Sequence, residues 1–576
     1  MAHEFRVWAP GRERVELVLG ERALPMRPAA GGWWERTVEE ARPGTDYAYA
    51  LDGGPPRPDP RSAHQPYGPH AHSRTVDHAA FPWTDAAWRG TPLPGAVLYE
   101  LHVGTFSPEG TFDGVIERLP HLAALGVDAI ELMPVAEFSG RRGWGYDGVS
   151  LYAPHHAYGG PDGMKRLVDA CHAHGLGVVV DVVYNHLGPS GNYLPEFGPY
   201  FTGRHTTNWG DGVNFDGPGS GEVRAFVIDN ALMWLRDYHC DGLRLDAVHA
   251  IADHSAAHVL ERLAEEVAEL AAHVRRPLFL IAESDLNDPR FVRSRESGGY
   301  GLDAAWADEW HHALHAALTG ERDGYYMDFG PLGLLAKALR QAWVYDGTWS
   351  PHRGRAHGRS PAGLSGHRFV VCAQNHDQVG NRARGERSGA LMSEGRLRVA
   401  AALLLTAPFT PMLFQGEEWG ASTPFQYFTD HEDPELGRAV SAGRRREFAA
   451  FGWEPGQVPD PQDAATFERS RLDWGEPGEE PHARLLAWHR ELIALRRRLP
   501  ALTDGRLDRV RADCDEAAGL VSVERGPVLV AANLGDGTRV VPARGRARLL
   551  AASDPGITLS GDDLTLPPDT VAILEG

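Results

Sequence analysis

The sequence predicts an α/β protein built on a (β/α)8 TIM barrel, with an N-terminal and a C-terminal β-sandwich domain. Eight short apolar segments of strand length recur between residues 95 and 420, and helical patterns separate several of them. Alternating strand patterns occupy both ends of the chain. At 576 residues the chain is too long for one simple core. We expect domains over residues 1–90, 91–502 and 503–576.

The two ends of the chain have the patterns of small β domains. Near the N-terminus, "FRVWAP", "RVELVLG" and "TDYAYAL" alternate or cluster apolar residues over strand length. This pattern resembles an immunoglobulin-like, carbohydrate-binding-module-like β-sandwich, and a Pro/Gly-rich stretch at residues 53–69 indicates a surface connection after it. Near the C-terminus, "GLVSVERG", "PVLVAANLG" and "DTVAILEG" predict the second sandwich.

The central region alternates strand and helix patterns. Helical patterns occupy residues 163–174, 222–238 and 256–273, and a longer one at 481–502 closes the predicted barrel. A doubly wound open sheet is the alternative, but its Gly-rich phosphate turn does not follow the first strand. The eight predicted strands are "AVLYELHV", "VDAIELMPV", "GVVVDVVY", "GLRLDAV", "FLIAES", "GLDAAWADEW", "FVVCAQNHD" and "FTPMLFQGEE".

Composition restricts the partners of the protein. The net charge is −21, from 57 basic and 78 acidic residues, which disfavours nucleic acid and anionic membranes and favours a neutral substrate. The N-terminus lacks a cationic region followed by an apolar one, and no apolar segment approaches the ~20 residues that span a bilayer. We therefore expect a cytoplasmic protein. Its four cysteines lack metal-ligand spacing, and three of them lie in apolar patterns that predict buried, reduced thiols: Cys171, Cys240, Cys372 and Cys514.

Polar residues stand where the predicted strands end, which is the side of such a barrel that carries the active site. In "GLRLDAVH", Arg244 and Asp246 are two residues apart, so their side chains share one face of the strand. A structural ion pair is one interpretation, because buried charges are normally paired. The functional interpretation is a carboxylate oriented by a guanidinium and suited to act as a nucleophile.

Glu283 ends the next strand, "PLFLIAES", after apolar and small residues. Burial and repulsion from the neighbouring Asp246 carboxylate predict a raised pKa for Glu283, as a general acid near neutral pH requires. Consecutive parallel strands are often neighbours. Two carboxyls about 5–5.5 Å apart on such strands would form the site of a retaining glycosidase.

Further polar side chains follow the third and seventh strands. Asp181 and His186 lie in "VVVDVVYNH", and His376 and Asp377 lie in "VVCAQNHDQ". Such residues offer donors and acceptors for sugar hydroxyls, and their spacing does not form a zinc-ligand cluster. In the glycine-flanked "WGYDG", Trp144 and Tyr146 offer aromatic faces that can stack on a sugar, although core packing is the commoner use of such residues.

Two other clusters of polar residues are expected to lie on the protein surface and not in the active site. His311, His312 and His315 have helical spacing and are expected on a solvated or capping face. The run at residues 444–446, three arginines, is expected to be surface charge.

Four short segments, in this order, resemble the signatures of the α-amylase superfamily: "DVVYNH" at residues 181–186, "GLRLDAVH" at 242–249, "ESD" at 283–285 and "NHDQ" at 375–378. The resemblance spans the whole predicted barrel. It implies Asp246 as the nucleophile, Glu283 as the proton donor and Asp377 as the carboxylate that stabilises the transition state. It also implies these substrate-binding residues: Tyr146, Asp181, His186, Arg244, His249, Asp285, His376 and Gln378.

Longer stretches distinguish among the members. "RRGWGYDGV", "QNHDQVGNRARGERS" and "TFERSRLDW" are most similar to the members that release trehalose. That similarity implies cleavage of the α-1,4-glucosidic bond next to the terminal trehalose unit of malto-oligosyltrehalose, which malto-oligosyltrehalose synthase would supply. A glycogen branching or debranching enzyme is the alternative, and a non-catalytic glycan-binding relative is a third. Retention of both Asp246 and Glu283 disfavours the last.

The resemblance leaves two details open. Asn185 could supply an oxygen ligand to calcium, but a second set of ligands is not evident, so we expect no metal and no cofactor. Contacts to the trehalose unit would come from variable loops. Asp285, Trp209 and Gln378 are candidates because they lie in or near the motifs, and Arg382 is left open.

Overall fold

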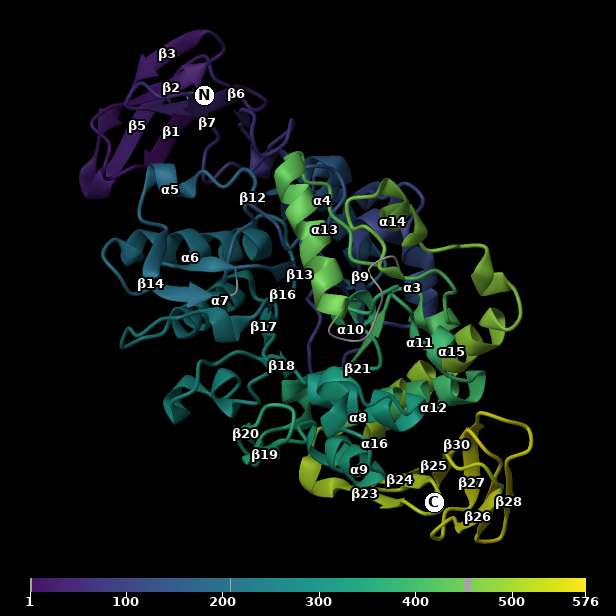
Figure 1. Cartoon of the computed structure of the whole chain (residues 1–576). Coiled ribbons are helices and arrows are strands. Elements are labelled where there is room, and N and C mark those ends of the chain that lie inside the picture. The colour runs from purple at the N-terminus through teal and green to yellow at the C-terminus, as the bar shows by residue number, and fades with distance from the viewer. Residues whose placement is uncertain (1–2, 208, 450–456) are drawn as a thin grey trace.

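The computed structural model describes residues 3–207, 209–449 and 457–576. Its centre is a closed barrel of eight parallel strands, and each of the eight predicted segments supplies one (Figure 1). The fold prediction is therefore confirmed. In chain order the strands are β9 (Leu98–Leu101), β10 (Ala129–Leu132), β13 (Gly177–Val182), β16 (Gly242–Leu245), β17 (Phe279–Ala282), β18 (Ala304–Trp306), β21 (Phe369–Cys372) and β22 (Thr410–Phe414).

The interior of the barrel changes from apolar to charged along the strands. Leu98, Ala129 and Val179 belong to an apolar cluster inside the barrel. Two residues further along β9, β10 and β13, the same faces present carboxyl side chains. Register places these groups in pairs: Glu100 opposite Glu131, and Asp181 opposite Arg244. The charged layer thus lies at the C-terminal ends of the strands, beneath the loops of the barrel mouth.

Helices cover the outside of the barrel (Figure 1). Helix α4 places Met164, Leu167 and Val168 in the core, at the i, i+3, i+4 spacing of an amphipathic helix. The main helices are α3 (Leu119–Leu125), α4 (Gly160–Ala173), α6 (Ser220–Arg236), α7 (Val259–Val274), α8 (Asp308–Thr319), α9 (Leu332–Gln341), α12 (Glu394–Leu405), α13 (Pro434–Ala449) and α15 (His482–Arg498). None of the helices in the described ranges is long and apolar enough to cross a membrane.

The N-terminal region forms two antiparallel sheets that share a core. The rings of Phe5 on β1 (His3–Trp8) and Tyr47 on β6 (Asp46–Leu51) lie 4.9 Å apart. The first sheet contains β1, β5 (Trp33–Val38) and β4 (Arg27–Pro28). The second contains β3 (Arg22–Pro25), β2 (Val15–Leu19), β6, β7 (Pro56–Arg57) and β8 (Ser73–Arg74).

The C-terminal region also forms two antiparallel sheets, which pack on either side of Leu529, Leu564 and Leu574. The larger sheet contains β23 (Val510–Asp515), β24 (Leu520–Arg525), β25 (Val528–Asn533), β30 (Thr570–Glu575) and β27 (Arg548–Ala552). The smaller contains β26 (Arg539–Pro542), β29 (Asp563–Leu566) and β28 (Thr558–Ser560). All four cysteines are free, and Cys514 is the exposed one.

Hairpins and short helices are inserted into the loops that follow the strands. They are β11 (Ala136–Glu137) with β12 (Ser150–Pro154), β14 (Phe201–Thr207) with β15 (Gly210–Val213), β19 (Thr348–Ser350) with β20 (Arg355–His357), α5 (Leu194–Phe197), η7 (Gly324–Asp328) and α10 (His376–Gly380). Several of them carry residues of the site described next.

Candidate active site

Asp246 follows β16 at the barrel mouth, where two donors hold it. Arg244 Nη1 donates to Asp246 Oδ1 at 2.8 Å, and Asn185 Nδ2 donates to Asp246 Oδ2 at 2.8 Å. The same guanidinium nitrogen donates to Asp181 Oδ2 at 2.8 Å. The predicted pairing of Arg244 with Asp246 is present. Because each oxygen of Asp246 accepts a hydrogen bond, the carboxylate has a fixed orientation.

Glu283 follows β17 and is held by the turn that contains Asp246. Ala247 has φ 39° and ψ 50°, a left-handed conformation that costs a non-glycine residue roughly 1–3 kcal/mol. The turn directs the backbone N–H of Ala247 to Glu283 Oε2, at 2.6 Å. Arg244 Nη2 lies 3.8 Å from the same oxygen. The strained turn therefore positions Glu283 next to Asp246.

The carboxyl of Glu283 keeps its proton over an extended pH range. Burial raises the pKa of Glu283 well above its usual value, against the opposing effect of the Arg244 guanidinium. The carboxylates that raise it further are those of Asp246, Asp308 and Asp377. Since Oε2 accepts the backbone N–H of the strained turn, we expect a proton on this carboxyl to lie on Oε1. The raised pKa that the sequence predicted is present.

Tyr146, Asp181 and His376 form one hydrogen-bonded group with Arg244. The Tyr146 hydroxyl donates to Asp181 Oδ2 at 2.7 Å and lies 2.9 Å from His376 Nε2. The Tyr146 and His376 rings stack, with centroids 5.2 Å apart. On its other side, His376 Nδ1 lies 2.5 Å from Oε1 of the buried Glu100. The structure thus brings together four of the predicted substrate-binding residues beside Asp246.

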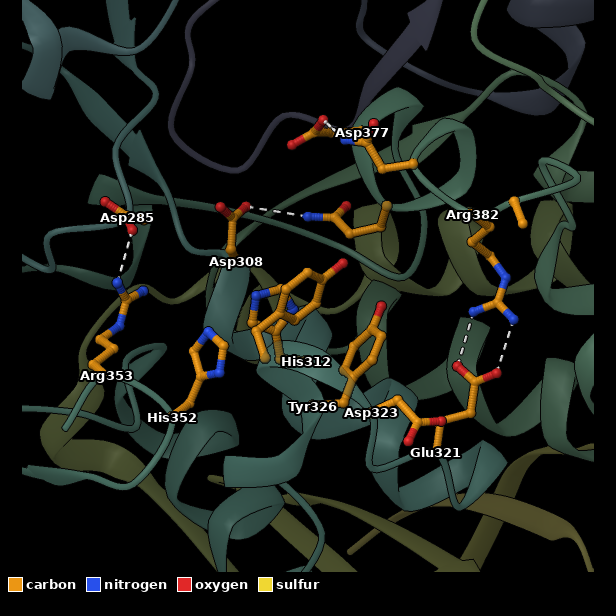
Figure 2. A pocket seen from close by; sticks show the side chains of 14 residues that line it. Asp285, Asp308, His312, Glu321, Asp323, Tyr326, His352, Arg353, Asp377 and Arg382 are labelled. Atoms are coloured by element: carbon orange, nitrogen blue, oxygen red, sulfur yellow. Dashed lines mark hydrogen bonds and ion pairs between the residues drawn. The ribbon is translucent and has the colours of Figure 1, made fainter. Parts of the chain in front are cut away.

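A cavity of about 450 Å³ opens at the barrel mouth beside Asp377 (Figure 2). Asp377 lies in the first turn of α10, where Asn375 Oδ1 accepts the backbone N–H groups of Asp377 and Gln378, both at 3.0 Å. Asp285, also predicted as a site residue, lies on the cavity wall. The other lining residues are Asp308, His312, Glu321, Asp323, Tyr325, Tyr326, His352, Arg353, Gln378, Asn381, Arg382 and Ala383.

Two ion pairs lie on opposite sides of this cavity (Figure 2). Arg353 Nη1 lies 2.9 Å from Asp285 Oδ2, and Arg382 donates to both oxygens of Glu321 at 2.8 Å. Glu321 also contacts His315 Nε2 at 2.7 Å, and hydrogen bonds from these two partners lower the pKa of Glu321 to about 2. Both walls therefore present charged groups of fixed orientation.

The remaining predicted residues lie around the mouth. His186 Nε2 lies 3.0 Å from the backbone oxygen of Tyr146, and Nδ1 contacts Asn185 Oδ1. The half-exposed Trp209 stacks on the His186 ring, with centroids 4.6 Å apart and an interplanar angle of 8°. His249 is exposed in the turn that follows Asp246.

The prediction of a solvated histidine face on α8 was wrong. His311 and His315 are buried, and their rings lie 5.3 Å apart. His311 Nε2 lies 2.9 Å from the Tyr326 hydroxyl, and His312 stacks on Tyr325 at 4.5 Å. The aromatic residues of η7 cover these histidines, so the helical spacing marks a face that packs against a loop.

The structure also corrects the expectations for Trp144 and for the arginine run at residues 444–446. Trp144 packs in a core cluster with Phe425, whose ring lies 5.4 Å away, so its face is covered by protein and not offered to a sugar. In the arginine run, Arg444 donates to the backbone oxygen of Gly380 at 2.6 Å and to Asn381 Oδ1 at 2.9 Å. It therefore supports α10, whereas Arg445 and Arg446 are exposed.

Sequence reasoning missed three acidic residues of the site: Glu100, Asp308 and Glu321. Burial raises the pKa of Asp308 to about 7, and Asp377 adds to that effect. Glu100 had a visible signal, since it interrupts the apolar strand segment "VLYELHV". Asp308 also had a local signal, since it follows the apolar residues 304–307 of the sixth predicted strand, whereas Glu321 lies in a mixed polar segment where nothing local distinguishes it from a surface acid.

Two groups of described side chains bring histidine and carboxylate ligand atoms within reach of one ion: Glu137 with His155 and His156, and His205 with Asp216 and His254. Neither group includes Asp246, Glu283 or Asp377. Hydrogen bonds account for both, such as 2.8 Å from His156 to Glu137 and 3.0 Å from His205 to Asp216, so we assign no metal to them.

The barrel and its carboxyl cluster define a glycoside hydrolase of the α-amylase type. The family model "Alpha amylase, catalytic domain" matches residues 75–199, and a model of a domain of unknown function, DUF3459, matches residues 505–573. Malto-oligosyltrehalose trehalohydrolase from Arthrobacter ramosus is 56% identical over 95% of each chain. That from Mycobacterium tuberculosis is 50% identical over 99% of each chain. The chain belongs to the malto-oligosyltrehalose trehalohydrolase family.

Solved structures agree with the fold. A putative alpha amylase from Salmonella typhimurium has a TM-score of 0.92 and 40% identity, with 100% of this chain and 98% of that chain covered. A pullulanase from Anoxybacillus has a TM-score of 0.74 at 18% identity, which supports the fold alone. A branching enzyme from Xanthomonas euvesicatoria is 32% identical, but over 54% of this chain.

Proposed function

We propose that this chain hydrolyses the α-1,4-glucosidic bond next to the terminal trehalose unit of malto-oligosyltrehalose and releases trehalose. The observation that carries the proposal is the geometry of two carboxyls at the entrance to a polar cavity: Asp246 is oriented by Arg244, and Glu283, whose pKa is raised by burial, is held beside it. Membership of the trehalohydrolase family supports the choice of substrate.

The mechanism is a double displacement. Glu283 donates its proton to the glycosidic oxygen while an oxygen of Asp246 attacks the anomeric carbon, and trehalose leaves. Glu283, now ionised, takes a proton from water, and that water attacks the anomeric carbon and releases Asp246. Two inversions give net retention, so the new reducing end is the α anomer.

Asp377 stabilises the positive charge that develops on the reacting sugar ring, because its carboxylate lies at the cavity beside Glu283. Arg244 keeps Asp246 oriented for attack, through the 2.8 Å contact described above. Tyr146, Asp181 and His376 bind the same ring through its hydroxyls. The stacked pair of Trp209 and His186 borders the ring, and the exposed His249 contacts the sugar chain from the rim.

The cavity holds the departing trehalose unit. Sugar hydroxyls donate and accept hydrogen bonds, and the ion pairs supply both kinds of partner from opposite walls. Of the predicted contacts, Asp285 and Gln378 line this space, as does Arg353. A neutral, hydroxyl-rich ligand accords with charged groups that already neutralise one another in pairs.

The substrate requires a supplier that rearranges the reducing end of a malto-oligosaccharide into a trehalose linkage. We propose that the chain acts after such a malto-oligosyltrehalose synthase, in the cytoplasm. The net charge of −21 supports the expectation that neither nucleic acid nor an anionic membrane is a partner.

Maltotriosyl-trehalose and maltopentaose, which have equal length, test the proposal. We expect rapid release of trehalose from the first and slow cleavage of the second. Equal rates would contradict it in favour of a general amylase. Longer or branched products would contradict it in favour of a glucan-transferring enzyme, which hands the glycosyl unit to a sugar hydroxyl.

A further inference from the structure

Glu100 is a buried carboxylate that has no assigned role in the reaction. It lies in the first barrel strand, β9, one residue before the strand ends at Leu101, and the residue is 1% exposed. Glu131 is its register partner on β10 and lies at the same depth, also 1% exposed. The two glutamates are neighbours in the charged layer, and of these two described residues Glu100 is the one with hydrogen bonds to His376.

Glu100 contacts His376 at two points. Its Oε1 lies 2.5 Å from His376 Nδ1, and its Oε2 accepts the His376 backbone N–H at 2.9 Å. One carboxylate therefore fixes both the ring and the backbone at the start of α10. Asp377, the next residue, occupies the first turn of the same helix.

The hydrogen bonds around His376 determine how many protons its ring carries. Tyr146 has one hydroxyl proton, and it donates that proton to Asp181 at 2.7 Å. His376 Nε2, 2.9 Å from the Tyr146 oxygen, must therefore be the donor in that contact. Nδ1 faces the carboxylate of Glu100, so it also carries a proton. With both nitrogens protonated, the ring is an imidazolium.

The surroundings of His376 contain charges of both signs. Burial lowers the pKa of His376, while Glu100 and then Asp377 raise it and Arg244 lowers it, and the result lies above the usual value. The titratable and charged groups that face the ring are Glu100 from β9, His102 from the loop after β9, Tyr146 from the loop after β11, Asp181 from β13, Arg244 from β16 and Asp377 from α10.

We propose that Glu100 is a positioning residue for glycoside hydrolysis, which holds His376 as an imidazolium and so reserves the Tyr146 hydroxyl proton for Asp181. If His376 loses its proton from Nε2, that nitrogen becomes an acceptor and the Tyr146 hydroxyl turns to it. Asp181 then loses a hydrogen bond and keeps its contacts with Arg244. The inference rests on the proposed function only in the experiments that measure activity.

Glu100→Gln tests the proposal, and Glu131→Gln is the matched control. Burial raises the pKa of Glu131 well above its usual value, which favours the neutral carboxyl that glutamine resembles. Among the described residues, Glu131 Oε2 has no hydrogen-bond partner. We expect Glu100→Gln to lower kcat by roughly tenfold to a hundredfold, the effect of one charge-assisted hydrogen bond, with little change in KM.

The pH profile distinguishes positioning from simple loss of structure. Removal of the Glu100 charge lowers the pKa of His376, so the imidazolium and the activity are lost at lower pH. We expect the alkaline limb of kcat to move down by about one pH unit or more in Glu100→Gln. In Glu131→Gln the limb should stay where it is in the wild type. An unmoved limb in Glu100→Gln, or an equal shift in both variants, would overturn the proposal.

A spectroscopic measurement on the wild type needs neither activity nor a stable Glu100 variant. Histidine-labelled protein is recorded by long-range 15N–1H NMR, and His376 is assigned by its absence in His376→Gln. We expect both ring nitrogens of His376 to be protonated at pH 7. A neutral His376 ring at pH 7 would overturn this proposal and leave the proposed function standing. A protein that contains the imidazolium but releases no trehalose would contradict the proposed function and leave this proposal standing.

Discussion

The backbone N–H of Ala247 donates to Glu283 Oε2 across 2.6 Å, and Ala247 directly follows Asp246 in the chain. The residue proposed as nucleophile and the donor that orients the proposed acid therefore belong to one strained turn. This turn couples the geometry of the two carboxyls.

The environment of Glu283 contributes to the alkaline limit of activity, together with the protonation of His376 proposed above. Glu283 must be protonated to act as an acid, so activity is lost as the pH rises through its pKa. Asp308, whose own pKa is about 7, raises the pKa of Glu283 when it is ionised. We expect Asp308→Asn to lower the alkaline limb of kcat/KM by about one pH unit. Asp323→Asn, on the same cavity, is the control. An unshifted limb in Asp308→Asn would exclude this electrostatic role.

Azide distinguishes the roles of the two carboxyls. Asp246→Ala and Glu283→Ala should each lower kcat by roughly 10⁴-fold or more, with the fold intact by circular dichroism. With azide added, Asp246→Ala should form the β-glycosyl azide, because a single displacement inverts the anomeric carbon. Glu283→Ala should form the α-glycosyl azide by attack on the Asp246 ester. Exchanged anomers would mean that the roles are reversed.

Arg353 should affect binding more than chemistry. Its guanidinium lies 2.9 Å from Asp285 on the cavity wall, away from the bond that breaks. We expect Arg353→Gln to raise KM for maltotriosyl-trehalose about tenfold, from loss of one charged hydrogen bond, with a smaller change in kcat. Arg355→Gln, at an exposed position two residues on, should behave as the wild type. Unchanged KM in Arg353→Gln would remove Arg353 from the binding site.

Gly380 should not tolerate a side chain. A Cβ at this position would lie 2.1 Å from Trp144 Cζ2, and the tryptophan is buried. We expect Gly380→Ala to lower the free energy of unfolding by about 1–3 kcal/mol, as measured by denaturant titration. Activity should fall too, because Gly380 shares α10 with Asp377. Gly389→Ala, where the nearest atoms are 3.9 Å away, should be nearly neutral. Equal stability of both variants would show that Trp144 can move aside.

The barrel and the carboxyls proposed as catalytic were predictable because each signal is local. An apolar run that ends in a polar residue marks both a strand and its position at the barrel mouth, as with Asp246 and Glu283. The shared face of Arg244 and Asp246 follows from the two-residue period of a strand. The exact domain boundaries stay predictions.

The errors concern side chains whose neighbours are distant in the sequence. Tyr326 covers His311 and belongs to a separate short helix, η7. The helical spacing of the histidines does not show this cover, so it indicated a solvated face. Trp144 is covered by Phe425, which follows the last barrel strand. The contacts of Glu100 with His376 also join opposite ends of the barrel sequence. Only closure of the barrel brings these residues together.

Time-resolved ¹H NMR of maltotriosyl-trehalose hydrolysis tests the central claim most directly, since it reports the bond cleaved and the stereochemistry together. We predict trehalose and maltotriose as the first products, with the new reducing end appearing first as the α anomer and then mutarotating. First appearance of the β anomer would contradict the double displacement through Asp246. Products without trehalose would contradict the proposed function itself.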